Sequence, residues 1–255
     1  MADEQQGDRQ RLAEVNLPWQ PDHEIESNIA IGSLRDSILA WLTTGRGVHV
    51  ETLMTVVGKL AGFAAQCAAW DAVRRSGKPA PKDGLVLATT PSGERFYFGD
   101  LINGYLVPEG AREWTVWGFG AAAAVEAGLP EARLPDYVDM FRHASATIGT
   151  GDFGIPRVSA DHRPHLSPKE ALVRFWPAAR AILARTDGPE PGKSVPVEYW
   201  PAILGLVARQ YILMAREALD PAMSLSLVME SAITMSKVDP DSIPTTASAA
   251  PEMAR

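Results

Sequence analysis

A short segment past the middle of the chain carries the residue types best suited to chemistry. Asp161, His162 and His165 lie within the five-residue sequence DHRPH, and Asp152 precedes them on the same stretch. Carboxylate oxygens and imidazole nitrogens are ligands that zinc and other divalent ions accept. Such a set, with one position left open, would activate a water molecule for hydrolysis. A metal site built from Asp152, Asp161, His162 and His165 is therefore one hypothesis.

The competing interpretation is that these histidines are solvated residues leading into a helix. The H-x-x-H spacing in a loop fixes no geometry, unlike H-E-x-x-H on a helix face. The sequence SPKE follows, in which Ser167 suits the N-cap, Pro168 the first helical position and Glu170 the return bond of a capping box. We expect a helix to start there and favour this interpretation. No cofactor is expected, and a divalent metal is the alternative.

Other candidate residues are assigned structural roles. His49 and Glu51 flank the start of a long apolar segment, and His143 lies in a separate expected helix. Their distance from the irregular loop cannot be deduced from sequence, so ordinary helical roles are favoured. Cys67 is the only cysteine and has small apolar neighbours, which predicts a buried, unreactive thiol.

The sequence GTGDFG at 149–154 fits the G-x-G-x-x-G pattern of dinucleotide-binding loops. Those loops lie between a strand and a helix, whereas here an expected helix precedes the motif and Pro156 follows closely. We interpret the segment as a turn whose glycines supply positive φ angles. The chain also lacks a P-loop and a G-x-S-x-G serine motif.

The spacing of apolar residues predicts a mainly α fold with one β-hairpin. The only strand signal is two apolar runs, 85–89 and 94–98, around the turn sequence TPSG. We expect a multi-helix single domain of about 7–8 helices with the hairpin near 85–98. The expected helices cover 24–44, 49–75, 101–107, 109–128, 134–148, 168–186, 197–218 and 221–237.

The two ends of the chain are expected to stay outside this domain. Residues 1–22 are polar and predict a flexible N-terminal arm, and 239–255 are rich in Pro, Ser, Thr and Ala, which predicts a disordered C-terminal tail. The single helical domain would then cover 23–238, as the length of 255 residues allows.

The helix expected at 49–75 has a narrow polar stripe, which predicts that neighbours cover most of its surface. Gly58, Ala61, Gly62 and Ala65 leave one side small enough for a close helix contact. A bulky residue at Gly62 should therefore disrupt helix packing.

Charge and hydropathy limit the classes of partner. The net charge is −7 and the isoelectric point about 5.3, so neither nucleic acid nor an anionic membrane is an expected partner. The apolar windows 116–129 and 201–215 fall short of the ~18–20 residues that span a bilayer. The N-terminus has no signal-peptide pattern, which predicts a cytoplasmic protein.

Three functional hypotheses follow, and no resemblance to a known family decides among them. The simplest is a non-enzymatic protein that acts by self-association, as a homodimer, or by binding another protein. The second is a metal-dependent hydrolase or metal-binding protein using the 152–165 loop. The third is a protein that binds an apolar small molecule between its helices. Aromatic residues suited to a ligand pocket or an interface are Trp114, Trp117, Phe96 and Phe98.

Overall fold

The computed structural model describes residues 18–79, 84–108, 114–185 and 193–246, and within these ranges the mainly α fold with one antiparallel hairpin is confirmed. The helices are α2 (Glu24–Leu42), α3 (Val50–Ser76), α4 (Asp100–Leu106), α5 (Val116–Glu126), α6 (Tyr137–Thr147), α7 (Pro168–Leu183), α8 (Trp200–Ala215) and α9 (Pro221–Met235). The strands are β1 (Val86–Thr89) and β2 (Arg95–Phe98), paired through a turn in which Gly93 has a φ of 87°.

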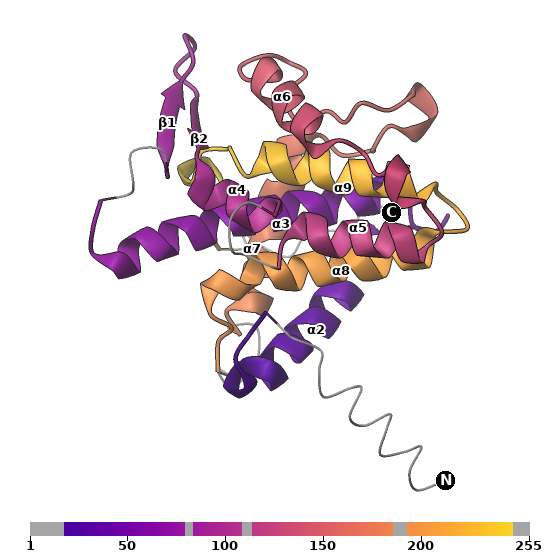
Figure 1. Ribbon diagram of the computed structural model, residues 1–255, viewed down its shortest axis with the longest axis horizontal. Helices are drawn as coiled ribbons and strands as arrows, with labels where there is room; N and C mark the ends of the chain where they lie inside the picture. Colours follow the sequence, from indigo (N-terminus) through magenta and orange to yellow (C-terminus); the bar gives the residue numbers. More distant parts are fainter. Residues whose placement is uncertain (1–17, 80–83, 109–113, 186–192, 247–255) are drawn as a thin grey trace, which may run out of the picture.

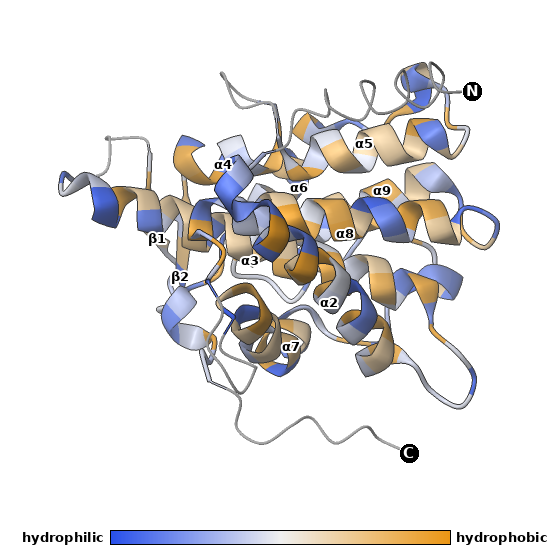
Figure 2. Ribbon diagram, turned by 90° about the horizontal axis from the view of Figure 1, so that it is seen from below, coloured by the Kyte–Doolittle hydropathy of each residue, from blue (hydrophilic) through white to orange (hydrophobic). Residues whose placement is uncertain are grey.

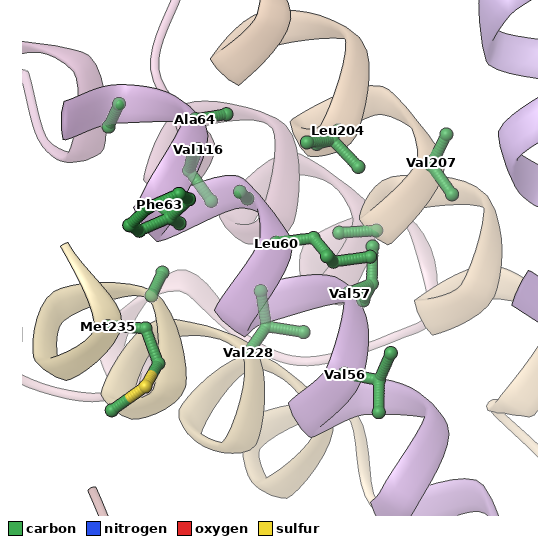
Figure 3. Packing of buried hydrophobic residues seen from close by; sticks show 14 of the residues in the cluster. Val56, Val57, Leu60, Phe63, Ala64, Val116, Leu204, Val207, Val228 and Met235 are labelled. Atoms are coloured by element: carbon green, nitrogen blue, oxygen red, sulfur yellow. The ribbon is translucent and has the colours of Figure 1, made fainter. Parts of the chain in front are cut away.

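Helix α3 runs through the centre of the fold with α8 and α9 packed against it, and α5 packs on α8 and α9 (Figure 1). Val57 and Leu60 of α3 lie between Leu204 of α8 and Val228 of α9 in the close view of the core (Figure 3). Within the described residues, α3 is the one helix long and apolar enough to cross a membrane. Its apolar window is 94% buried inside the fold, so the hydrophobic surface of α3 is already used for packing.

The contact between α3 and α9 is a direct backbone contact. A Cβ atom added at Gly62 would lie 2.6 Å from the carbonyl carbon of Ala232, and one added at Gly58 would lie 2.9 Å from that of Val228. Real Cβ atoms do not approach other atoms this closely, so only glycine fits at either position. The close helix approach expected from the small residues is therefore confirmed, inside the protein rather than between copies of it.

Helices α2 and α7 cover α3 on another side and lie next to one another (Figure 2). Trp41, near the end of α2, stacks on Phe175 of α7 with ring centroids 5.5 Å apart. The hydroxyl of Tyr211 on α8 donates a hydrogen bond of 2.6 Å to the carbonyl oxygen of Arg35 on α2. These contacts fix the end of α2, which forms one wall of the candidate site.

The first part of the expected disordered tail is ordered. The amide of Tyr97 donates to the carbonyl oxygen of Lys237, which extends the hairpin by one bridge to the chain after α9. Arg95 pairs with both Asp239 and Asp241 at 2.7 Å, and Ile243 is buried. The prediction for 239–246 is therefore wrong, because one apolar side chain and two carboxylates bind this segment to the hairpin. Residues 247–255 lie outside the described ranges.

The N-terminal arm differs from the expectation in the same way. Trp19 is 5% exposed and belongs to the core, so the last residues of the expected arm pack against the domain. Residues 1–17 lie outside the described part of the chain.

Two helix starts also differ from the sequence-based expectation. Helix α5 begins at Val116 with Thr115 as its cap, whereas the sequence predicted a start near 109; residues 109–113 are not described. The N-cap of α4 is Gly99, and Asp100 is already its first residue. Helix α7 continues through Pro177 without a break.

Candidate functional site

The segment between the DHRPH sequence and α7 is bound to the first turns of α3. The backbone amide of His165 donates a hydrogen bond of 2.9 Å to Oγ1 of Thr52. Two turns further along α3, Nζ of Lys59 lies 3.5 Å from the carbonyl oxygen of Leu166. The backbone amide of Ser167 donates a hydrogen bond of 3.4 Å to Oε2 of Glu170, as the expected capping box requires. The loop and α3 therefore form one structural unit, although they lie more than a hundred residues apart in the sequence.

His49 is the N-cap of α3, and its hydrogen bonds assign its tautomer. Nδ1 accepts the backbone N–H of Thr52 at 3.3 Å, so this nitrogen carries no proton. The hydroxyl of Thr52, 2.9 Å away, therefore donates to the same nitrogen. The other ring nitrogen, Nε2, lies 3.3 Å from Oε2 of Glu51 and carries the ring proton.

Glu51 joins two histidines from different parts of the sequence. Its Oε1 accepts a hydrogen bond of 2.7 Å from Nδ1 of His162, and its Oε2 faces His49. Its side chain is 12% exposed. The structural role expected for His49 at a helix start is confirmed, but the sequence did not indicate that His49 and Glu51 also meet the irregular loop.

The protonation of this cluster follows from burial and neighbouring charge. Burial lowers the pKa of His49; the carboxylate of Glu51 opposes that effect, and His165 and His162 add to it. Burial raises the pKa of Glu51, but the hydrogen bond from His162 and the neighbouring imidazoles outweigh it, so the net pKa lies below its ordinary value. At neutral pH the cluster therefore contains a carboxylate and a neutral His49.

The rings of His49 and His165 stack, with centroids 3.8 Å apart and 22° between their planes. The stack holds the side chain of His165 over the start of α3, although His165 itself comes from an exposed loop.

A cavity of about 410 Å³ opens beside this stack, between the end of α2, the start of α3 and one face of α7. Its polar lining residues are Thr44, Arg46, His49, Thr52, His165 and Arg174. Its large apolar lining residues are Trp41, Leu42, Val48 and Leu166. The described lining thus combines an apolar wall with two arginines and two histidines, and it contains no Asp or Glu.

The two arginines of the cavity are available for a ligand. Among the described residues neither Arg46 nor Arg174 has a carboxylate partner; Arg174 lies 5.2 Å from the ring centroid of Phe175. Arg46 is at the tip of a turn in which Thr44 and Gly47 exchange backbone hydrogen bonds of 3.0 Å. Gly47 has a φ of 96°, which favours glycine, so the turn that presents Arg46 depends on that residue.

The four residues of the predicted metal site are not gathered by the fold. Asp152 is exposed in the turn after α6, and Asp161 is exposed in the short 3-10 turn Ala160–His162. His162 binds Glu51, and His165 stacks on His49. Across the described ranges, no group of three or more His, Cys, Asp or Glu side chains is spaced to hold a metal ion.

The aromatic candidates lie elsewhere than this cavity. Trp117 is buried against Tyr137, and Trp114 stacks on Phe119 at 5.7 Å. Phe98 lies 5.6 Å from Nζ of Lys237, and Phe96 lines a second cavity, of about 490 Å³, between the hairpin and the 149–153 turn. Trp114, Trp117 and Phe98 line neither cavity.

The remaining sequence motifs have structural explanations. In GTGDFG, Gly149 and Gly154 have φ angles of 73° and 81°, as the turn interpretation predicts, and α6 precedes the motif. Burial raises the pKa of the Cys67 thiol to about 12, so this cysteine is protonated and unreactive at neutral pH.

Comparison of the chain with protein-family models, with curated proteins and with solved structures found no match. The function therefore has to be inferred from the site itself.

Proposed function

We propose that the protein binds a small organic anion, one with an apolar or aromatic body, in the cavity beside the His49–His165 stack. The single observation that carries this proposal is a pair of arginines, Arg46 and Arg174, that line a largely apolar cavity and have no carboxylate partner among the described residues. Guanidinium groups form strong, charge-assisted hydrogen bonds with carboxylate and phosphate oxygens. The chain as a whole is acidic, so the positive charge here is a local feature.

The size and the apolar wall indicate the kind of anion. A cavity of about 410 Å³ lies within the range of small-molecule sites. Trp41 offers an aromatic side chain that is already held against Phe175, so little ordering is needed when a ligand packs on it. This refines the hypothesis of an apolar ligand: the ligand has an apolar body and a negatively charged end.

Self-association remains a prediction with no particular surface to support it. The small-residue stretches that could serve such a contact, around Gly58–Gly62 and Gly120, are already packed against α9 and α8 inside the chain. The exposed large apolar residues are spread over many elements: Ile25, Ile29, Val86, Leu87, Val125, Val138, Ile155, Val173 and Met214. A metal-dependent function also remains a prediction.

Isothermal titration with benzoate, compared with the uncharged benzyl alcohol, tests the proposal. We expect one benzoate per chain, and binding of benzyl alcohol weaker by about tenfold or more, because a hydrogen bond to a charged group contributes about 1.5–3 kcal/mol. Arg174→Gln should weaken benzoate binding by a similar factor. Arg133→Gln is the matched control, since Arg133 is exposed outside the cavity.

Two results would contradict this function. One is the absence of benzoate binding to the unmodified protein. The other is an equal loss of affinity in Arg174→Gln and Arg133→Gln, which would mean that overall charge rather than the cavity determines binding.

A further inference from the structure

We propose that Thr52 is a nucleophile that accepts the acyl group of an ester whose anionic part is held by Arg46 and Arg174. The inference rests on the proposed function, because the arginines bind the substrate. It adds an activity, acyl transfer and ester hydrolysis, to what would otherwise be a binding site.

Three side chains at the start of α3 form the connected set that such chemistry requires. Oγ1 of Thr52 lies 2.9 Å from Nδ1 of His49, and Nε2 of His49 lies 3.3 Å from Oε2 of Glu51. This is the order hydroxyl, imidazole, carboxylate, in which the imidazole is the general base and the carboxylate orients it. Such sets are recognised by geometry and roles rather than by sequence motif, which explains why no serine motif signals it.

The proton positions suit the reaction. Nδ1 of His49 carries no proton, and its lone pair is shared between the backbone N–H of Thr52 at 3.3 Å and the hydroxyl of Thr52 at 2.9 Å. The shorter contact is the one along which the hydroxyl proton passes to Nδ1. Nε2 carries the ring proton and lies 3.3 Å from Oε2 of Glu51, close enough for the carboxylate to stabilise the imidazolium that forms. Glu51 is itself fixed from the other side by Nδ1 of His162 at 2.7 Å.

The same residues belong to the cavity in which a ligand would lie. Thr52 and His49 both line the cavity that contains Arg46 and Arg174. The backbone amide of His165 holds Oγ1 of Thr52 at 2.9 Å and leaves the second lone pair of this oxygen for attack.

The reaction balances with water as the only co-reactant. Oγ1 attacks the carbonyl carbon of the ester while His49 takes the hydroxyl proton. The bond from that carbon to the leaving oxygen breaks, and His49 returns the proton to this oxygen, which gives a free alcohol and an acyl ester on Thr52. Water then attacks the acyl ester in the same way, which releases the acid and restores the hydroxyl.

The simpler explanation of the same contacts is that His49 and Thr52 only cap a helix. Three variants separate the two explanations. His49→Asn keeps a good N-cap but removes the base. Thr52→Ser keeps the hydroxyl, and Thr52→Val removes it.

The experiment is hydrolysis of 4-acetoxybenzoate by the full chain, whose carboxylate matches that of benzoate. Release of 4-hydroxybenzoate is measured, and peptide mass mapping locates any acetyl group. We expect turnover, or an acetyl group at position 52, in the unmodified protein and in Thr52→Ser. We expect a loss of about a hundredfold or more in His49→Asn and in Thr52→Val, the typical contribution of a general base.

Binding of benzoate and thermal unfolding are measured on the same preparations. Equal product release by the unmodified protein, His49→Asn and Thr52→Val, with benzoate binding intact, would overturn this inference and leave the proposed function standing. An acetyl group on residues other than Thr52 would overturn it as well. Loss of benzoate binding in the unmodified protein would instead overturn the proposed function.

Discussion

Replacing Gly62 with alanine should destabilise the protein by at least about 3 kcal/mol, the upper end of the usual cost of an overpacked core. The added Cβ would lie 2.6 Å from the carbonyl carbon of Ala232 and closer still to its oxygen. A backbone group cannot move aside as a flexible side chain can, so α3 and α9 would have to separate. Because this contact is central, much of the core around Leu60 and Val228 would lose packing with it.

Urea unfolding followed by circular dichroism measures the effect. The matched control is Gly32→Ala on α2, where an added Cβ meets no atom within 4 Å. That substitution should stabilise the protein by about 0.5–1 kcal/mol, since alanine is the better helix former. If Gly62→Ala unfolds with the free energy of the unmodified protein, the backbone contact between α3 and α9 does not exist.

The second large effect is expected from Lys59→Met. Lys59 is 1% exposed, and its only hydrogen bond among the described residues is the one of 3.5 Å to Leu166. Burial lowers the pKa of Lys59 to about 8, against a smaller opposing effect of Glu170. A buried amine with so little compensation destabilises the fold whenever it is charged.

The direction of the pH dependence follows from that pKa. Between about pH 8 and the ordinary lysine pKa of about 10.4, the unfolded chain binds more protons at Lys59 than the folded chain does. The free energy of unfolding therefore rises with pH across this range, by up to about 3 kcal/mol in total. Methionine fills a similar volume without a charge, so Lys59→Met should be more stable at pH 7 by a similar amount.

Chemical unfolding at pH 7, 8.5 and 9.5 measures this difference. The gap between Lys59→Met and the unmodified protein should shrink as pH rises, and Lys78→Met, at an exposed position, should show no such change. A gap that stays constant with pH, or a variant that is less stable at pH 7, would show that the Lys59 amine is charged and compensated in the folded state.

The fold could be predicted from sequence where a local pattern determines it. The apolar spacing located α2 and α3 to within about two residues, and the SPKE sequence located the start of α7. The segment 239–246 was predicted wrongly because it is held by the ion pair of Arg95 with Asp239 and by the burial of Ile243. Amino-acid composition does not reveal such contacts with distant parts of the chain.

The candidate site shows the same limit more strongly. The sequence singled out His162 and His165, but their partners, Glu51, His49 and Thr52, lie more than a hundred residues earlier. Nothing in the sequence marked Arg46 or Arg174 as ligand-binding residues, because arginines are common near helix ends and on helix faces. Only the packing of α2, α3 and α7 brings these side chains to one cavity.

The central claim is that this cavity holds an organic anion, and a crystal structure of the protein grown with 4-bromobenzoate tests it most directly. The anomalous signal of bromine locates the ligand independently of the rest of the density. We predict the bromine beside Trp41 and the carboxylate within hydrogen-bond distance of Arg46 or Arg174. Bromine bound only outside this cavity, or a cavity filled by water at saturating ligand, would contradict the account.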